Sequence, residues 1–385
     1  MKNKKLKRII LCITFIVLSP LISAIIYNIL PNLSISAGKL ATMSAEVILC
    51  ETVPTTEEEE FSAKEEKEFF KEKLDDTLML SVGNPVEFET SVTYDKIPEI
   101  DESFIGPQPY PEKLENHDGK INSMRFFKAE GPQYINLDRA GQVRNFSGIS
   151  NARLLQESRK LPDFKIKFNS EPQVLIMHTH TTESFEPYER DFYDKSFTSR
   201  STEESMNVVS IGNRIEKELI LAGISVIHDR TLHDYPSYNG SYDRSEVTVK
   251  NILAQYPSIK IVLDIHRDGI ENKDGTRIAP IVNVDGRNAA QIMIISGCDD
   301  GGNLGIPEYM KNFHFACHIQ QQFEEDYPGL TRPVMFAHRK YNQHLTTGSL
   351  LIEVGSHGNS IQQVQYSGEL IGKALARALE KIKED

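Results

Sequence analysis

The chain has 385 residues, 39% hydrophobic and 25% charged, values typical of a soluble protein with a sizeable core. Its net charge is −12, and no basic stripe occurs beyond the first eight residues, which argues against nucleic acid as a partner. The four cysteines are scattered and lack CxxC spacing, so neither a zinc ribbon nor a disulfide framework is indicated. We expect free thiols, with a single Cys298–Cys317 bridge as the alternative.

The N-terminus has the pattern of a membrane anchor. A basic stretch, residues 1–8, precedes an uncharged apolar run, residues 9–30, which is about long enough to cross a bilayer. The basic residues favour a cytoplasmic tail, so the chain after Leu30 is expected outside the cytoplasm. A cleaved signal peptide is the alternative, but the run is long for one and no clear cleavage site follows it. We predict a single-pass protein of the cell membrane.

Residues 31–170 are polar, and we predict that they form an extracytoplasmic linker or accessory region. An acidic block at residues 57–60 is followed by mixed charges at 64–68, a pattern typical of a solvated helix face or a stalk. Proline and glycine recur between Pro98 and Pro132 with little periodicity, so this pattern does not predict a particular fold.

From residue 171 onward, strand-like apolar runs alternate with amphipathic helical stretches. The expected strands are residues 174–177, 224–227, 259–265 and 349–354, with two more within 282–295. The expected helices are residues 208–221, 245–256, 307–323 and 361–382. This alternation predicts one catalytic domain over residues 171–385, a three-layer α/β/α fold with a twisted mixed sheet. Ligands in such folds bind beyond the carboxyl ends of the strands.

Imidazoles and carboxylates follow three of these strands. Catalytic zinc usually takes three protein ligands and keeps one position open for water. We predict His180, Glu183 and His266 as these ligands, with His178 as a further ligand or a group that orients one of them. Glu353 ends the late strand and is the expected general base, which takes a proton from water and passes it to the leaving amine.

Two residues beside His266 have open roles. Asp264 lies two positions earlier, on the same side of its strand, and either orients His266 or pairs with Arg267 or a backbone amide. Arg267 is predicted to bind a peptide carboxylate or to polarise the scissile carbonyl, with a structural ion pair as an equal alternative.

Other histidines are expected to be surface or groove residues. Those near the second strand, His228 and His233, either line a substrate groove or cap a helix. The remaining members of this set are His314, His318, His338, His344 and His357. No GxSxG or GKS/GKT motif is present, which disfavours serine hydrolases and P-loop NTPases.

Four separated segments closely resemble the stage II sporulation protein P family and occur in the family's order. They are VLIMHTHTTESF, VIHDRTLHDYPSYNGSYDRS, IVLDIHRDG and LLIEVGSHGNS, within residues 171–385. The resemblance implies a membrane-anchored N-acetylmuramoyl-L-alanine amidase that also acts as an endopeptidase on peptide cross-links. It further implies removal of septal peptidoglycan during forespore engulfment, on the mother-cell side. The implied partners are stage II sporulation proteins D and M.

The family's fold is similar to that of AmiC-type zinc amidases and zinc carboxypeptidases. Those carboxypeptidases use an HxxE pair, a later histidine after a strand and a late glutamate as base, an order that His180, Glu183, His266 and Glu353 match. AmiC-type amidases place their ligand glutamate just before an Asn-Val-Val-like run, which would make Glu204 the ligand here. We favour Glu183, because it lies in the same motif as His180.

Two other functions remain as alternatives. A catalytically inactive peptidoglycan-binding scaffold would have no need of a general base, so the intact set of site residues argues against it. A secreted zinc carboxypeptidase acting on proteins would carry a specific arginine and tyrosine set for free C-termini. That set has no evident place in this sequence.

Overall fold

The computed structural model describes residues 108–384, and the structural statements below concern that part of the chain. The predicted cytoplasmic tail, the predicted membrane anchor and the predicted linker as far as residue 107 lie outside the described residues. Within residues 108–384, no helix combines the length and the apolar character that crossing a membrane requires.

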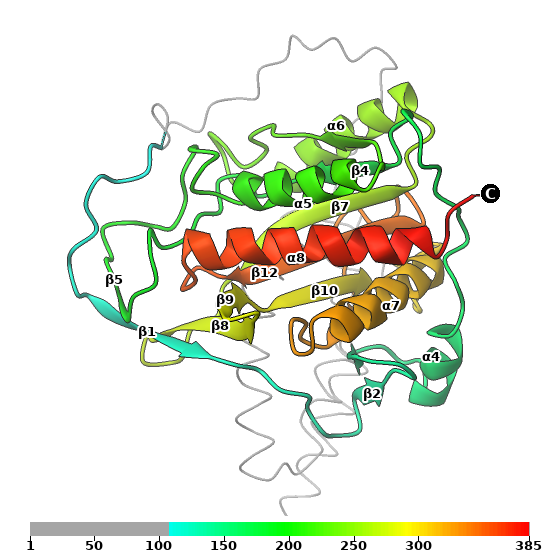
Figure 1. Ribbon diagram of the computed structural model, residues 1–385, viewed down its shortest axis with the longest axis horizontal. Coiled ribbons are helices and arrows are strands. Elements are labelled where there is room, and N and C mark those ends of the chain that lie inside the picture. Colours follow the sequence, from blue (N-terminus) through cyan, green and yellow to red (C-terminus); the bar gives the residue numbers. More distant parts are fainter. Residues whose placement is uncertain (1–107, 385) are drawn as a thin grey trace, which may run out of the picture. The chain divides into compact units, whose positions relative to one another are not determined.

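The domain is built on an eight-stranded mixed sheet with helices on both faces (Figure 1). In sheet order, the strands are β2 (Tyr134–Asn136), β3 (Gln142–Asn145), β11 (Val334–Ala337), β10 (Ile292–Gly297), β12 (Gly348–Ser356), β7 (Ile261–Asp268), β4 (Val174–Met177) and β6 (Val226–His228). Strands β12, β7, β4 and β6 are mutually parallel. Strand β10 is antiparallel to β12, and β11 and β3 run in the same direction as β10. The carboxyl ends of these two groups therefore lie at opposite edges of the sheet.

The helices divide unequally between the two faces. They are α4 (Asn151–Glu157), α5 (Val209–Leu221), α6 (Ser241–Gln255), α7 (Tyr309–Asp326) and α8 (Ile361–Glu380). Helices α5, α8 and α7 lie side by side across one face (Figure 1) and share its large apolar core. Helix α6 packs on the other face over a smaller cluster that includes Val262 of β7. This arrangement confirms the predicted α/β class.

Strand alternation determines which residues of β7 and β12 face α6. Ile261, Leu263 and Ile265 of β7 join the large core beneath α5 and α8. Because successive side chains of a strand point to opposite faces, Val262 begins a row on the α6 face that continues to Asp264 and His266.

A second, four-stranded sheet includes segments far apart in the sequence. In order, its strands are β5 (Phe192–Tyr193), β1 (Gly119–Met124), β8 (Arg277–Val284) and β9 (Arg287–Ala290). Strand β1 pairs with β8, and β3 pairs with β11 in the main sheet, so residues 119–145 belong to the same sheets as residues 171–384. We therefore correct the domain boundary predicted at residue 170. These short strands are specified by distant pairing partners, which local periodicity does not reveal.

Most predicted elements after residue 171 are present. The predicted strands 174–177, 259–265 and 349–354 correspond to β4, β7 and β12, and α5 ends shortly before Gly223, whose φ is +83°. The region 282–295 differs: it contains the end of β8, then β9 and most of β10. The turn at Asp285 and Gly286 has positive φ at both residues, as a tight hairpin requires. Cys298 and Cys317 are free thiols, as expected.

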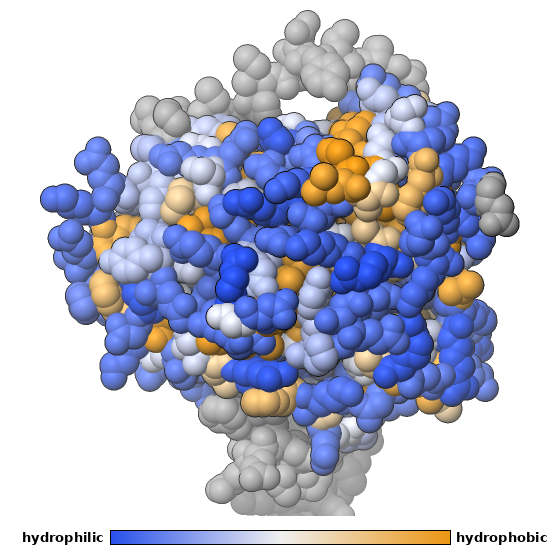
Figure 2. Space-filling model, viewed as in Figure 1, coloured by the Kyte–Doolittle hydropathy of each residue, from blue (hydrophilic) through white to orange (hydrophobic). Residues whose placement is uncertain are grey.

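The surface of the helical face in Figure 2 is largely hydrophilic. An apolar patch lies over the end of α5, where Ile220 and Leu221 are 54% and 71% exposed. Scattered apolar residues are normal on soluble proteins, so this patch by itself does not identify a site.

Glu157 fastens α4 to α7. Its Oε2 accepts a hydrogen bond from His314 Nε2 at 2.8 Å, and Arg153 and Lys160 also contact the carboxylate. Burial would raise the pKa of Glu157, but the hydrogen bonds from Lys160, His314 and Arg153 outweigh it and hold the pKa at about 2. His314 is therefore a buried partner of a carboxylate, not the surface residue that we expected.

Glu157→Gln should destabilise the protein at neutral pH by about 2 kcal/mol, because a buried charge-assisted network loses its charge. The folded-state pKa is depressed, so the contribution is complete above the unfolded value near 4.5 and disappears as the pH falls towards about 2. Urea unfolding of both proteins from pH 7 to pH 3 measures this. The control is Glu325→Gln at the exposed pair with Arg139, which should change stability by under about 0.5 kcal/mol.

Candidate functional site

His266, near the end of β7, lies at the centre of the predicted site and is fully buried. Its Nε2 is 2.8 Å from Asp264 Oδ1, and its Nδ1 is 3.5 Å from Glu183 Oε2. Neither contact has hydrogen-bond geometry. Two ligand atoms about 2.0–2.2 Å from one tetrahedral ion lie about 3.4 Å apart. The separation of His266 and Glu183 therefore suits two ligands of one cation.

The electrostatic field at His266 favours positive charge. Burial would lower the pKa of His266, but the carboxylates of Asp264 and Glu183 outweigh it and raise the pKa to about 10. Burial would likewise raise the pKa of Glu183, but His266, Arg267 and His180 hold it well below its usual range. Two ionised carboxylates thus converge on one imidazole, an environment suited to an imidazolium or a metal cation.

Asp264 holds the loop after β4 as well as facing His266. Its carboxylate accepts a hydrogen bond from the Thr179 N–H at 2.8 Å and another from the Thr179 hydroxyl at 2.7 Å. These contacts match both roles left open: Asp264 lies against His266, as an orienting residue would, and it also accepts a backbone amide N–H, that of Thr179.

His180 is held beside His266 by residues at the start of α6. Its ring stacks on Tyr238 at 4.6 Å between centroids and lies nearly perpendicular to the His266 ring at 5.2 Å. The nitrogens of His180 lie 3.2 Å from the Tyr238 hydroxyl and 3.3 Å from the Ser241 hydroxyl. The structure therefore brings His180 to the α6 face, next to His266.

Glu353 reaches the same place from β12. It is fully buried and is the register partner of His266 in the parallel pairing of β12 with β7. Directly paired residues on neighbouring strands point to the same face, so Glu353 and His266 share the α6 face. Burial is the largest cause that raises the pKa of Tyr242 well above its usual value, and the charge of Glu353 is a smaller cause, which places Glu353 near Tyr242. Four predicted residues thus converge: His180, Glu183, His266 and Glu353.

His178 points away from this cluster. Its Nδ1 lies 3.0 Å from the Ile265 carbonyl and its Nε2 lies 2.9 Å from His228 Nε2. A Cβ on Gly212 of α5 would come within 3.0 Å of the His178 ring, which places the ring against α5. Burial and the neighbouring His228 lower the pKa of His178 to about 3, so it is neutral at physiological pH. We correct its predicted role as a metal ligand, because alternation from Ile176 turns it to the opposite face.

Arg267 also alternates to the other face from His266. Its guanidinium donates to the backbone carbonyls of Ser184 at 3.0 Å, Ser199 at 3.0 Å and Asp268 at 3.2 Å. Its backbone N–H donates to Glu183 Oε2 at 3.0 Å. These contacts correspond to the structural alternative, although they are hydrogen bonds to carbonyls and not the ion pair that we expected. Arg267 connects the loop that carries Glu183 to β7. We correct its predicted catalytic role.

Glu204 lies apart from the cluster, although we considered it as an alternative ligand. It is exposed, and its Oε2 is 3.9 Å from an Arg230 guanidinium nitrogen. Glu183 instead contacts His266 directly. The structure thus supports the preference for Glu183 as the carboxylate of the site.

Several residues around the cluster were missed by sequence reasoning. Tyr238 and Tyr242 flank His180, and the guanidinium of Arg200 lies 4.7 Å from the Tyr238 ring centre and 3.8 Å from Glu183 Oε1. Arg200 also donates to Asp234 at 2.8 Å, and its side chain is 27% exposed. None of these has diagnostic spacing; only the family-like segment that contains both tyrosines pointed to this region.

The other histidines expected at the surface or in a groove are also buried or paired, among them His233, His338 and His344. His318 is buried, with Nε2 2.9 Å from the Ala378 carbonyl, and His357 is buried with Nε2 3.5 Å from Glu271. His228, half-buried as a residue, contacts both His178 and Glu216. Helix and strand packing, which a lone histidine does not signal, determines these positions.

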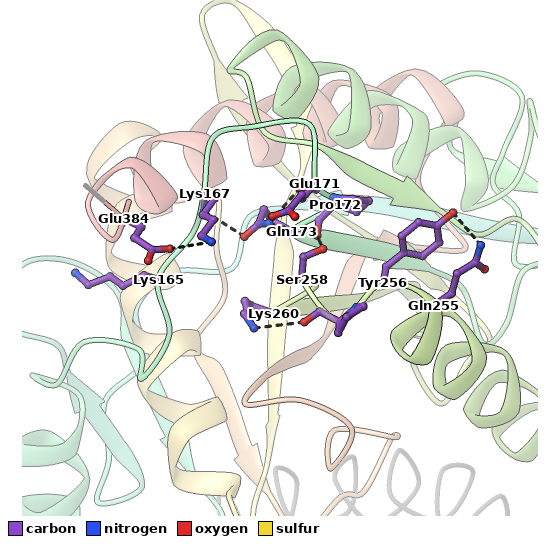
Figure 3. A pocket seen from close by; sticks show the side chains of 11 residues that line it. Lys165, Lys167, Glu171, Pro172, Gln173, Gln255, Tyr256, Ser258, Lys260 and Glu384 are labelled. Atoms are coloured by element: carbon purple, nitrogen blue, oxygen red, sulfur yellow. Dashed lines mark hydrogen bonds and ion pairs between the residues drawn. The ribbon is translucent and has the colours of Figure 1, made fainter.

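A cavity of about 410 Å³ lies elsewhere, at the amino ends of β4 and β7 (Figure 3). Its polar side chains largely bond to groups in its own wall: Ser258 Oγ donates to the Pro172 carbonyl at 2.7 Å and Gln173 Nε2 donates to the Glu171 carbonyl at 3.1 Å. Ligands in α/β sheets bind at the carboxyl ends of strands, so we assign the site to the cluster around His266.

Residues 95–376 match the family described as Stage II sporulation protein P. The chain belongs to this family. A relative, stage II sporulation protein P of Bacillus subtilis (strain 168), is 26% identical over 250 residues, which cover 62% of this chain and 58% of the relative. The match thus spans less than two thirds of the length of that relative.

Solved structures with some similarity include two amidases and a carboxypeptidase. The amidase AmiC2 of Nostoc punctiforme has a TM-score of 0.34 and 14% identity, covering 55% of this chain and 97% of that one. The CwlD amidase of Clostridioides difficile, in complex with the GerS lipoprotein, has a TM-score of 0.33 and 9% identity, and the match covers 54% of this chain and 99% of that one. A metallo-carboxypeptidase of Burkholderia cenocepacia has a TM-score of 0.29 and 9% identity, and the match covers 62% of this chain and 70% of that one. At such TM-scores, these similarities establish nothing further about this chain.

Glu183→Gln should weaken zinc binding by the full chain at least about tenfold, because a neutral amide replaces a charged ligand next to His266. Glu204→Gln should leave the affinity unchanged. Equilibrium dialysis of zinc against both variants measures this, with circular dichroism to verify folding. The reverse result, with only Glu204→Gln weakened, would move the ligand role to Glu204.

Arg267→Met should destabilise the protein by about 3 kcal/mol, because the hydrogen bonds of a buried guanidinium to three carbonyls are lost. Arg230→Met, at an exposed position, is the matched control and should change stability by under about 0.5 kcal/mol. Urea unfolding of the two variants gives the comparison. Unaltered stability of Arg267→Met together with lost activity would restore Arg267 to the catalytic set.

Proposed function

We propose that this protein is a zinc-dependent peptidoglycan hydrolase, an N-acetylmuramoyl-L-alanine amidase that also cleaves peptide cross-links. The proposal rests mainly on one observation: His180, Glu183 and His266 converge on the face of the sheet that Glu353 also reaches. Membership of the stage II sporulation protein P family supports it.

The donor set fits zinc, which takes imidazole nitrogens and carboxylate oxygens in catalytic sites. His180, Glu183 and His266 would hold the ion. When bound, zinc would supply Lewis-acid chemistry, polarising the scissile carbonyl and making water acidic enough to attack at neutral pH. The buried nitrogens of His266, which lack hydrogen-bond geometry among the described residues, support this fit.

The protein's own groups then move the proton and hold the geometry. Glu353 takes a proton from the attacking water and delivers it to the amide nitrogen that leaves. Asp264 fixes the ring of His266, and the Arg267 N–H fixes the Glu183 carboxylate. The partly exposed guanidinium of Arg200 beside Glu183 suits binding of a carboxylate on the peptide stem.

The proposed cellular setting follows from the N-terminal pattern and the family. Residues 9–30 would form the single membrane span, with the catalytic domain outside the cytoplasm on the mother-cell side of the sporulation septum. There the enzyme would remove septal peptidoglycan during forespore engulfment. Stage II sporulation proteins D and M are the proposed partners.

Glu353→Gln should retain zinc but lose about 10²–10⁴-fold in the rate of sacculus digestion, because the base is removed while the ligands remain. The full chain and the variant are incubated with purified sacculi and zinc, and the products are analysed by mass spectrometry. Free peptide stems and intact glycan strands are expected from the unaltered chain.

Glu271→Gln is a suitable control, because Glu271 is likewise a carboxylate next to a histidine, His357, and its side chain is 46% exposed. An active Glu353→Gln variant would remove Glu353 as the base. Sacculi that bind the unaltered chain but stay uncut, with zinc and protein D present, would favour the inactive scaffold.

A further inference from the structure

A second group of metal-ligating side chains lies outside the candidate site. Within residues 108–384, Cys298, Asp300 and His338 place a thiol sulfur, a carboxylate oxygen and an imidazole nitrogen within 4.8 Å of one another. Cys298 is fully buried, and the side chain of His338 is 47% exposed. The cluster thus combines a buried ligand with an opening to solvent.

Two parallel strands, β10 and β11, carry this cluster just after their carboxyl ends, next to the loop after β3. Cys298 directly follows β10, and its N–H donates to the Ala337 carbonyl at the end of β11 at 2.7 Å, which sets His338 beside it. Asp300 Oδ2 accepts the Gly148 N–H at 2.8 Å, from the loop after β3. The cluster therefore lies at the sheet edge opposite the carboxyl ends of β4, β7 and β12.

The backbone around the cluster is held in place. A Cβ on Gly297 would come within 2.3 Å of the Arg339 carbonyl, so only glycine lets the segment after His338 approach β10 so closely. Gln343 accepts the Gly297 N–H at 2.8 Å and donates to the Ile295 carbonyl at 3.0 Å, clamping that segment to β10. The ligand-bearing loops are thus preorganised without any ion.

A neighbouring carboxylate fixes the loop that carries Asp300. Asp299 accepts backbone N–H groups from Asn303 at 2.7 Å, Leu304 at 3.0 Å and Ile306 at 3.0 Å. These bonds hold the turn that begins at Asp300, next to His338.

We propose that Cys298, Asp300 and His338 form a second zinc site, distinct from the one around His266. Sulfur, nitrogen and oxygen from cysteine, histidine and aspartate are the ligands that zinc takes in proteins, and the solvent side leaves room for a fourth, water ligand. Ligand atoms around tetrahedral zinc lie about 3.3–3.8 Å apart, so small side-chain rotations from the present positions suffice.

A cysteine nucleophile would need a different order of groups. In such a site, the imidazole base lies next to the thiol, and the carboxylate lies on the far side of the imidazole and orients it. Here the carboxylate of Asp300 contacts the imidazole of His338 and also lies within 4.8 Å of the Cys298 sulfur. The carboxylate thus lies beside the thiol and not behind the imidazole, so the order of groups is not that of a cysteine nucleophile.

The second site is linked to the first by one segment of chain. Three residues after His338, Tyr341 stacks on Tyr242 at 5.4 Å, and Tyr242 in turn lies parallel to the His266 ring at 6.4 Å. Asn342 donates to the Tyr242 carbonyl at 2.9 Å. An ion at Cys298 would therefore fasten the start of a segment whose next residues support the aromatic wall of the candidate active site.

Cobalt titration of the metal-free full chain tests the proposal, because cobalt bound to thiolate gives a near-ultraviolet charge-transfer band that nitrogen and oxygen ligands do not give. We expect this band in the unaltered chain, its loss in Cys298→Ser and its retention in Cys317→Ser, whose cysteine is buried in α7. His338→Ala, at a half-exposed side chain, should keep the fold and weaken cobalt binding at this site at least about tenfold.

The same titration of His180→Ala separates the two proposed sites. This variant should lose sacculus digestion but keep the thiolate band, whereas Cys298→Ser should lose the band and still digest sacculi. Absence of the band in the unaltered chain, its persistence in Cys298→Ser, or unaltered affinity in His338→Ala would each overturn the second site. An enzyme that proves inactive but shows the band would overturn only the proposed function.

Discussion

A buried imidazole between two buried carboxylates is the constraint on which the rest of this domain depends. Taking His266, Asp264 and Glu183 out of water is costly unless each finds a partner. The surrounding structure provides these partners: Thr179 donates twice to Asp264, and the Arg267 N–H donates to Glu183. The excess of negative charge that remains around one imidazole is the electrostatic reason to expect a cation there.

Strand alternation places the polar residues of the cluster and the apolar residues of the core on opposite faces of the sheet. The apolar row of β7 that ends at Ile265 packs beneath α5 and α8, and the opposite row ends in Asp264 and His266. In β12, Ile352 and Val354 lie in the same large core, which turns Glu353 to the polar side. One face of each central strand thus stabilises the fold while the other face holds the chemistry, and a one-residue slip of register would exchange them.

The reversal of direction between β12 and β10 gives the sheet two edges at which side chains able to bind a metal gather. On one side, β4, β7 and β12 end near the histidine and glutamate cluster. On the other, β3, β11 and β10 end at Cys298, Asp300 and His338. At both edges, buried polar side chains accept hydrogen bonds from backbone N–H groups: Asp264 accepts from Thr179 at the first, and Gln343 accepts from Gly297 at the second. Binding groups on loops held by a rigid sheet are the usual arrangement in α/β proteins.

The sequence by itself determined the main strands and helices after residue 171 and the likeness to the family, and it predicted His180, Glu183, His266 and Glu353 as one site, four residues that the structure brings together. These are local signals: apolar periodicity, a polar residue at a strand end, and short motifs. Tertiary structure decided the contacts of His178 and Arg267: both are close in sequence to residues of the cluster, but His178 packs against α5 and Arg267 donates to backbone carbonyls near Ser184. It also decided that residues 119–145 join the sheets and that His338 meets Cys298, since strand pairing across nearly two hundred residues leaves no local pattern.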